Sequence, residues 1–189
     1  MTREALFLAF VAVIAACAPS ARAPSRLPEA TLLASDGPRR LAEIVKPGRV
    51  TVIVFFSADC PCQAAHDARL RDLFAAYRDR GVDLVAVDSE AGASPERSAK
   101  EAQARAYPFP LLADPGGALA DALGAEFATY SVVVDQQGRV RYRGGIDSDR
   151  AHLTADASPW VRNAVDRLLA NADPDPAEAE AFGCALRRK

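Results

Sequence analysis

The sequence predicts an α/β fold with a central mixed, mostly parallel sheet, an antiparallel hairpin at one side and helices on both faces. Apolar runs of strand length alternate with helical patterns in the order βαβα(β)αββα. That order suits parallel strands joined by crossover helices. Further along, Gln136-Gln137-Gly138 separates two short apolar runs, which is a hairpin signal. The pattern therefore favours a single layered domain.

The first half of the domain shows the clearest alternation. The apolar run over 50–56 is a buried strand, and the helical pattern that follows has its apolar residues on one stripe. Gly81 is well placed to end that helix. In chain order we expect a short helix over 41–45, a strand over 50–56, a helix over 61–80, a strand over 82–88 and a helix over 95–106.

The strands and helices predicted for the second half of the domain are shorter. Asp114 is placed to cap a helix, and Ser158-Pro159 is a start signal for the last one, whose buried face carries valines and leucines. In chain order we expect an extended segment over 109–112, a helix to Leu123, strands over 131–135 and 139–143, and a final helix to about Leu169.

The N-terminus has the pattern of a targeting segment. After Arg3, residues 5–16 form an apolar stretch that is short for a bilayer span. The stretch ends in Ile-Ala-Ala-Cys, which resembles the lipobox of bacterial lipoproteins. The resemblance implies that residues 1–17 are a lipoprotein signal peptide and that Cys17 is the lipidated residue. An ordinary cleaved signal and an uncleaved anchor are the alternatives, and each also puts the domain outside the cytoplasm.

The rest of the chain divides into three parts. Residues 18–28 lack apolar periodicity and are interpreted as a flexible tether. Residues 29–171 form the domain, and residues 172–189 form a tail that carries Cys184. The predicted location is the bacterial cell envelope, lipid-anchored to a membrane and facing the periplasm. The net charge is −2 with acids and bases interspersed, so no nucleic-acid partner is expected.

Two thiols lie where the buried strand gives way to a helix. The strand over 50–56 stops at Ser-Ala-Asp, and Cys60-Pro61-Cys62 follows at once. Free N–H groups and the positive end of a helix dipole favour a thiolate there. Thiolate is the nucleophile in disulfide exchange and in peroxide reduction. The alternative, two small apolar residues that fill a core, is a weaker explanation for a proline-spaced pair.

The element order and its cysteine site resemble the thioredoxin-like fold. More closely, the chain is similar to redoxin-domain proteins, which are related to alkyl hydroperoxide reductases, thiol-specific antioxidant proteins and membrane-tethered thiol–disulfide oxidoreductases. The resemblance spans about residues 28–187. It is carried by the segments 54–62 (VFFSADCPC), 111–114 (LLAD), 132–140 (VVVDQQGRV), 141–147 (RYRGGID) and 182–186 (FGCAL).

The departures from these families concern the site itself. The spacing is Cys-x-Cys rather than Cys-x-x-Cys, and Gln63 stands at the usual second-cysteine position. Asp59 stands where thioredoxins usually have tryptophan, and Thr129 stands at the position of their cis-proline. Ser57 fits the serine or threonine that peroxiredoxins place three residues before the reacting cysteine. The chain is therefore neither a standard thioredoxin nor a standard peroxiredoxin.

We interpret Cys60 as the nucleophile of a thiol–disulfide oxidoreductase that needs no cofactor. Either Cys62 or Cys184 would complete the cycle, and the sequence does not choose between them. A neighbouring Asp59 charge opposes the thiolate unless its side chain caps the helix. The expected partners are a redox partner protein or a small thiol or peroxide substrate.

Two other functions remain open from the sequence. A thiol peroxidase would use Cys60 with Ser57 against the peroxide. A copper-binding assembly factor, of the type that serves cytochrome oxidase, would use Cys60, Cys62 and His66 as ligands of a soft ion such as Cu(I). His66 is interpreted first as a helix-surface residue, because its spacing matches that chaperone family poorly.

Overall fold

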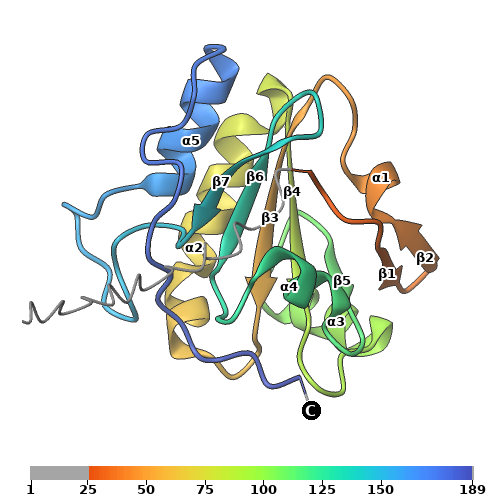
Figure 1. Ribbon diagram of the computed structural model, residues 1–189. Helices are drawn as coiled ribbons and strands as arrows, with labels where there is room; N and C mark the ends of the chain where they lie inside the picture. Colours follow the sequence, from red (N-terminus) through yellow and green to blue (C-terminus); the bar gives the residue numbers. More distant parts are fainter. Residues whose placement is uncertain (1–25, 189) are drawn as a thin grey trace, which may run out of the picture.

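The computed structural model describes residues 26–188, which fold around one seven-stranded sheet (Figure 1). The strand order is β2-β1-β5-β4-β3-β6-β7. The three central strands β5, β4 and β3 are parallel, and an antiparallel hairpin lies on each side of them. The strands are β1 (Thr31–Ala34), β2 (Gly37–Arg40), β3 (Val50–Phe56), β4 (Val82–Asp88), β5 (Leu111–Ala113), β6 (Ser131–Val134) and β7 (Val140–Gly144).

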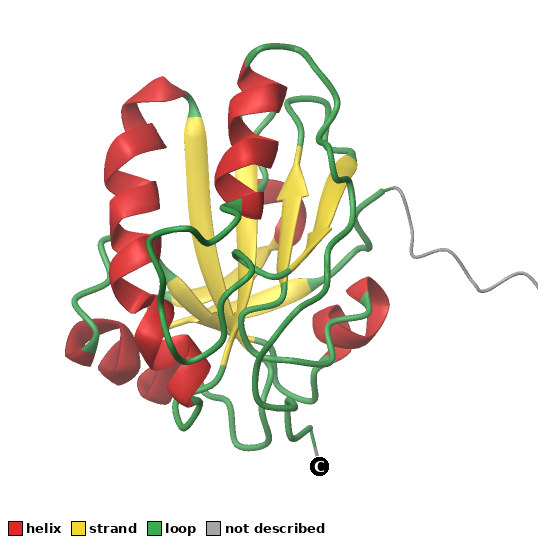
Figure 2. Ribbon diagram, turned by 90° about the vertical axis from the view of Figure 1, so that its left-hand side faces the viewer, coloured by secondary structure: helices red, strands yellow, loops and turns green. Residues whose placement is uncertain are grey.

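Helices cover both faces of this sheet, as Figure 2 shows in a second view. Helices α2 and α5 pack on one face, while α1 and α4 pack on the other. The predicted thioredoxin-like α/β fold with a mixed sheet is confirmed. The sheet is not mostly parallel as predicted, since four of its six strand pairings are antiparallel and the unexpected hairpin β1–β2 contributes two of them. The helices are α1 (Leu41–Ile44), α2 (Pro61–Tyr77), α3 (Pro95–Ala104), α4 (Ala118–Leu123) and α5 (Trp160–Leu169), with a short 3-10 helix η1 (Arg78–Arg80) after α2.

Strand β3 forms the centre of both core layers. All seven of its residues are buried, and successive side chains point to opposite faces of a strand. Val52, Val54 and Phe56 join the cluster under α2 and α5. Ile53 and Phe55 join the cluster under α1 and α4. Burial on both faces explains why every residue of this strand except Thr51 is apolar. The end of β3 also sets the point where α2 begins.

The structure differs from the predicted elements chiefly at two places. The hairpin β1–β2 was not expected, because its second strand, Gly-Pro-Arg-Arg, lacks the apolar alternation of a strand. Helix α2 ends at Tyr77, and η1 carries the chain to Gly81, which has a φ of 83°. Asp114 does cap α4, since its carboxylate accepts from the N–H of Leu119 and Ala120, although Gly117 is the residue at the cap position.

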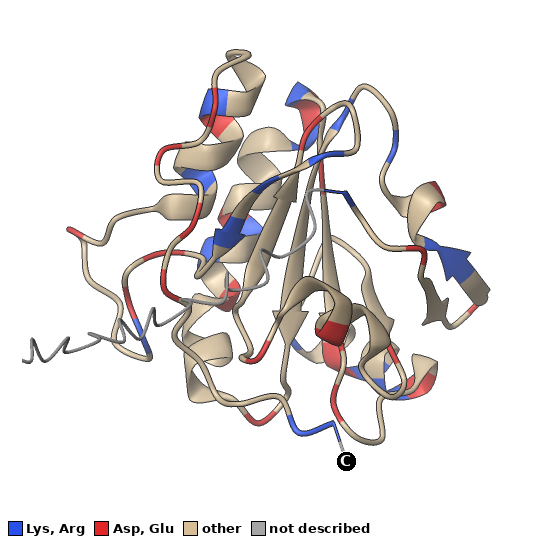
Figure 3. Ribbon diagram, in the orientation of Figure 1, with Lys and Arg blue, Asp and Glu red and all other residues tan. Residues whose placement is uncertain are grey.

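After α5 the chain runs back along β7 and crosses the carboxyl end of β3, where it finishes (Figure 1). Acidic and basic residues are interspersed over the elements (Figure 3). Within residues 26–188, no helix has the length and apolarity needed to cross a membrane. The predicted signal peptide with Cys17, and most of the predicted tether, lie outside these residues.

Candidate functional site

Cys60 lies at the seam between β3 and α2, as the sequence pattern indicates. It is the cap residue of α2, Pro61 is the first helical residue, and the loop 57–59 joins it to β3. Cys60 is only 1% exposed. The backbone N–H of Cys184, 124 positions further along the chain, donates a hydrogen bond to Cys60 Sγ at 3.2 Å. The fold therefore brings the tail cysteine to the first cysteine of the motif.

The surroundings of Cys60 favour its thiolate. Burial raises the pKa of this thiol, but the Cys184 thiol and the backbone N–H groups of Gln63, Cys184 and Cys62 lower it by more. The net effect is a pKa below the ordinary value for cysteine. A thiolate that accepts several hydrogen bonds is stabilised over the neutral thiol. Cys60 is thus the thiol of this site that is suited to act as a nucleophile.

The other two thiols are held in their protonated form. The pKa of Cys184 is raised to about 11, first because its thiol donates to Cys60 and then because of burial. The pKa of Cys62 is also raised, by burial and by the negative charge on Cys60. All three thiols are free in the structure. The arrangement is one thiol with a lowered pKa beside two thiols with raised pKa values.

Residues 177–188 form a C-terminal strap over this site. Its first part pairs with β7, where Arg143 N–H donates to Ala177 O and Ala179 N–H donates to Arg143 O, each at 3.0 Å. Its last part pairs with the loop 126–129 that precedes β6. Leu186, which is 8% exposed, packs into the core cluster on the α4 face. The strap therefore explains the burial of Cys60.

Thr129, expected at the cis-proline position, supports the strap in this structure. Its peptide bond is trans, since the one cis bond within residues 26–188 joins Asp175 and Pro176. Its φ is 70°, in the left-handed region that a β-branched residue rarely adopts. The side chain Oγ1 donates to Phe182 O at 2.8 Å, and the backbone N–H donates to Phe55 O. Thr129 thus links β3 to the strap.

The two polar residues before Cys60, Ser57 and Asp59, have side-chain partners other than its sulfur. Ser57 Oγ donates its hydrogen to Glu90 Oε1 at 2.9 Å, and both residues are buried. The Asp59 side chain is 78% exposed and lies 3.5 Å from Arg187 of the strap. Asp59 therefore does not cap α2. Its charge is directed towards solvent and a cation of the strap.

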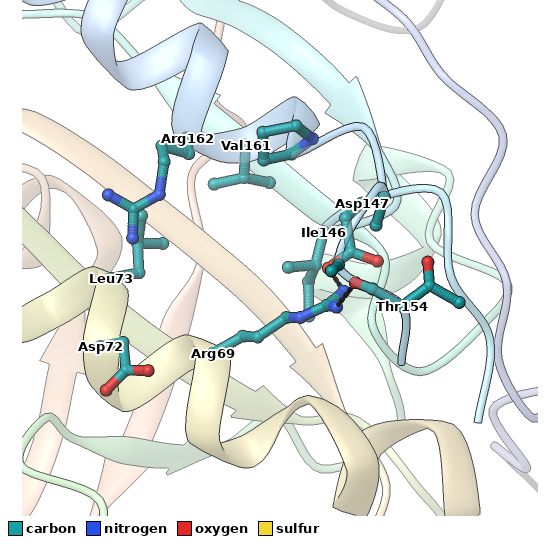
Figure 4. Close-up of a pocket in the computed structure, with 11 residues that line it drawn as sticks. Arg69, Asp72, Leu73, Ile146, Asp147, Thr154, Val161 and Arg162 are labelled. Atoms are coloured by element: carbon teal, nitrogen blue, oxygen red, sulfur yellow. Dashed lines mark hydrogen bonds and ion pairs between the residues drawn. The ribbon is translucent and has the colours of Figure 1, made fainter. Parts of the chain in front are cut away.

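His66 is buried, at 1% exposure, so the interpretation of it as a helix-surface residue is wrong. Its Nδ1 lies 2.7 Å from Cys62 O, and its Nε2 lies 2.9 Å from Asp147 Oδ1. Arg69 also contacts Asp147, at 2.6 Å, from the next turn of α2 (Figure 4). The sequence does not indicate the burial of His66, because its partner Asp147 lies 81 residues further along the chain. His66 fastens α2 to the loop after β7.

The ligand set Cys60, Cys62 and His66 is not assembled. Both ring nitrogens of His66 are occupied by acceptors. Burial lowers the pKa of His66, but the hydrogen bonds to Asp147 and to the Cys62 carbonyl raise it by more. Nowhere in the described part of the chain do three His, Cys, Asp or Glu residues form a group that could hold a metal ion.

A partly buried polar network supports the loop before Cys60, and sequence reasoning missed it. Arg105 Nη2 donates to Ala58 O at 2.6 Å and Nη1 donates to Asp67 at 2.7 Å. Tyr107 donates to the same carboxylate, and Gln63 Nε2 donates to Tyr107 at 3.0 Å. Of these residues, the sequence analysis singled out only Gln63, because it stands at the usual second-cysteine position. The others carry no local signal, because their partners are about 40 residues apart.

The fold and the site together define a thioredoxin-like protein with a cysteine pair at the strand–helix seam. Residues 22–158 match the Redoxin family, and the chain belongs to that family. Among curated protein sequences, none matches this chain.

Several solved structures are similar to this chain. An uncharacterized conserved protein from Geobacillus kaustophilus is 30% identical, with a TM-score of 0.77 over 87% of this chain and 90% of its own. A hypothetical protein from Sinorhizobium meliloti is 25% identical, with a TM-score of 0.80 over 90% of this chain and 96% of its own. A putative thiol:disulfide interchange protein DsbE from Chlorobium tepidum is 22% identical, with a TM-score of 0.55 over 63% and 82%. This last likeness shows the fold alone.

Proposed function

We propose that this protein is an extracytoplasmic thiol–disulfide oxidoreductase in which Cys60 is the nucleophile and Cys184 is the resolving cysteine. The observation that carries the proposal is the contact between Cys60 and Cys184. The Cys184 N–H donates to Cys60 Sγ at 3.2 Å, and the Cys184 thiol lowers the pKa of Cys60. Membership of the Redoxin family supports thiol chemistry in general.

Cys62 is the less suitable resolving residue. It lies inside the first turn of α2, so a Cys60–Cys62 disulfide would close a small ring and distort that turn. Cys184 lies on a separate segment that pairs with a loop, and it can adjust to the geometry of a disulfide without disturbing a helix. This difference favours Cys184 as the resolving cysteine, whereas the sequence alone does not choose between Cys184 and Cys62.

The reaction transfers two electrons to the partner. The Cys60 thiolate attacks one sulfur of a partner disulfide, that disulfide breaks, and the second partner sulfur leaves as a thiolate. Cys184 then gives its proton to the leaving thiolate or to water and attacks Cys60 Sγ. The bond between Cys60 and the partner breaks, and the partner is released with both thiols reduced. The protein is left with a Cys60–Cys184 disulfide, and the reverse sequence oxidises a partner.

The peroxidase alternative has less support at the site. It requires the Ser57 hydroxyl to contact a peroxide bound at Cys60. That hydroxyl instead donates to Glu90, which also accepts from Arg97 at 3.1 Å. The contact that Ser57 Oγ makes with Glu90 therefore does not favour a peroxidase function.

The test is disulfide mapping of the full chain by mass spectrometry, after oxidised glutathione and after mild peroxide. Wild type and the control Cys62→Ser should form a Cys60–Cys184 link that dithiothreitol reverses. Cys184→Ser should instead accumulate glutathione on Cys60. A dominant Cys60–Cys62 link would overturn the role of Cys184, and free thiols under both oxidants would overturn the function.

The proposal includes a lipid anchor at Cys17. Its support is the apolar run and the Ile-Ala-Ala-Cys sequence that ends there. Metabolic labelling with a clickable fatty acid in a bacterial host should mark the wild-type chain and leave Cys17→Ser unlabelled. Equal labelling of both chains would refute the anchor without affecting the redox chemistry.

A further inference from the structure

The strap occupies its site in the way that a bound peptide would. Ala128 N–H donates to Cys184 O, and Leu186 N–H donates to Glu126 O, each at 2.9 Å. These bonds flank an antiparallel bridge between Phe127 and Ala185. They use backbone atoms alone, so another extended segment could make them equally well. The loop 126–129 is therefore an edge able to pair with a strand, and it lies beside Cys60.

A protein partner can reach Cys60 only if the strap leaves. Cys60 is 1% exposed, and the strap donates directly to its sulfur. When the strap leaves, the Ala128 N–H and the Glu126 carbonyl lose their partners. Unpaired backbone groups next to an apolar surface are costly unless new hydrogen bonds form. An incoming extended segment with a cysteine at the position of Cys184 would restore them.

Two further contacts make this edge selective. A Cβ on Gly183 would fall 1.9 Å from Ala128 O, so the position before the cysteine has no room for a side chain. Two positions after that glycine, Ala185 is exposed. The next residue, Leu186, is buried in the cluster on the α4 face. The strap therefore defines a pattern of glycine, cysteine, any residue and a large apolar residue.

We infer that the edge formed by residues 126–128 is a binding site for an extended Gly-Cys-x-apolar segment of a partner protein, which replaces the strap. The inference rests on the proposed function, because it brings the partner's cysteine to Cys60. A cavity of about 330 Å³ adjoins the edge, lined by Glu126, Phe127, Arg150, Phe182 and neighbouring residues of the loop and the strap. The strap residues that precede Cys184 form one wall of this cavity.

The test uses the full chain with Gly183→Val, which removes the strap from the edge. The matched control is Ala185→Val, which adds the same side chain at an exposed position of the strap. The probe is a peptide with the sequence Glu-Ala-Phe-Gly-Ser-Ala-Leu-Arg-Arg, compared with versions that have valine for glycine or aspartate for leucine. Binding is followed by the NMR shifts of the amides of residues 126–128. Serine replaces cysteine in the probe, so that binding is measured without exchange.

We expect the glycine–leucine peptide to bind Gly183→Val at least about tenfold more tightly than wild type or Ala185→Val, because a tethered strap competes at high effective concentration. The two altered peptides should bind Gly183→Val at least about tenfold more weakly, a loss equivalent to about 1.4 kcal/mol. Equal binding of all three peptides would overturn the selectivity. Absence of shifts at residues 126–128, also in a second strap-release variant, Leu186→Asp, would overturn the site.

A second arm separates this inference from the proposed function. The same peptide with cysteine, carried as its disulfide with glutathione, should form a mixed disulfide with Cys60 faster in Gly183→Val than in Ala185→Val. Binding without exchange would refute the proposed function and leave the peptide edge standing. Exchange at equal rates for the glycine and valine peptides would refute the edge and leave the thiol chemistry standing. Association through the strap of a second copy is excluded in this variant, because every copy carries the valine.

Discussion

Leu186 anchors the strap, and its truncation should expose Cys60. Within residues 177–188 it is the one residue that is buried, and it packs against the cluster on the α4 face. Replacing a buried leucine by alanine costs about 2 kcal/mol or more, and a site near the surface belongs at the low end. If the strap opens locally while the domain stays folded, Leu186→Ala raises the open population about 30-fold.

The assay is alkylation of Cys60 by iodoacetamide in the full chain, read by mass spectrometry in a Cys62→Ser background. The rate should rise in proportion to the open population, about 30-fold in Leu186→Ala. Leu153→Ala is the matched control, because Leu153 is 37% exposed and makes no part of the strap. A rate for Leu186→Ala within about twofold of its parent would refute the reasoning, since a loss of about 2 kcal/mol must change the open population by far more than twofold.

Three further predictions follow from the polar contacts. Cys184→Ala removes a thiol that lowers the pKa of Cys60, so the pH profile of Cys60 alkylation should move to higher pH; an unchanged midpoint would contradict this. His66→Gln should destabilise the fold more at about pH 5.5 than at about pH 9 in urea titrations, because a raised histidine pKa gives stability below about 6.5 that is lost as the pH rises through the folded-state value. Only the protonated ring donates to both Asp147 and the Cys62 carbonyl, so equal losses at both pH values would show that the ring is neutral. Tyr107→Phe removes a buried hydroxyl bond and should lower the unfolding free energy by about 1 kcal/mol, and no change in the urea midpoint would discount that bond.

Much of the site could be predicted because its signals are local. The apolar run of β3, the Pro61 at the start of α2 and the helical pattern beyond it all lie within about thirty residues. They place Cys60 at a helix N-terminus, where a thiolate is favoured. The order of strands and helices likewise gives the fold class, since crossover connections have few allowed arrangements.

The rest of the site depends on contacts between distant segments. Nothing near His66 in the sequence indicates burial, because the carboxylate that makes burial possible belongs to the loop after β7. Nor does the sequence near Ser57 indicate its partner, because Glu90, which accepts the hydrogen bond of the Ser57 hydroxyl, lies 33 residues further along the chain. A buried polar side chain is stable only with its partner, and pairing at such separations leaves no periodic pattern to read.

The sequence by itself determined the fold class and the place of Cys60, since both follow from local propensity and periodicity. Tertiary structure alone decided that Cys184 lies against Cys60. The tail has no apolar periodicity, so its sequence predicts no element of secondary structure. In the structure it nevertheless lies over the site, and the Cys184 N–H donates to Cys60 Sγ. The physical reason is that backbone hydrogen bonds seat it on the loop 126–129, together with one buried leucine and a glycine that fits against Ala128. These interactions exist only once the sheet has brought the two segments together.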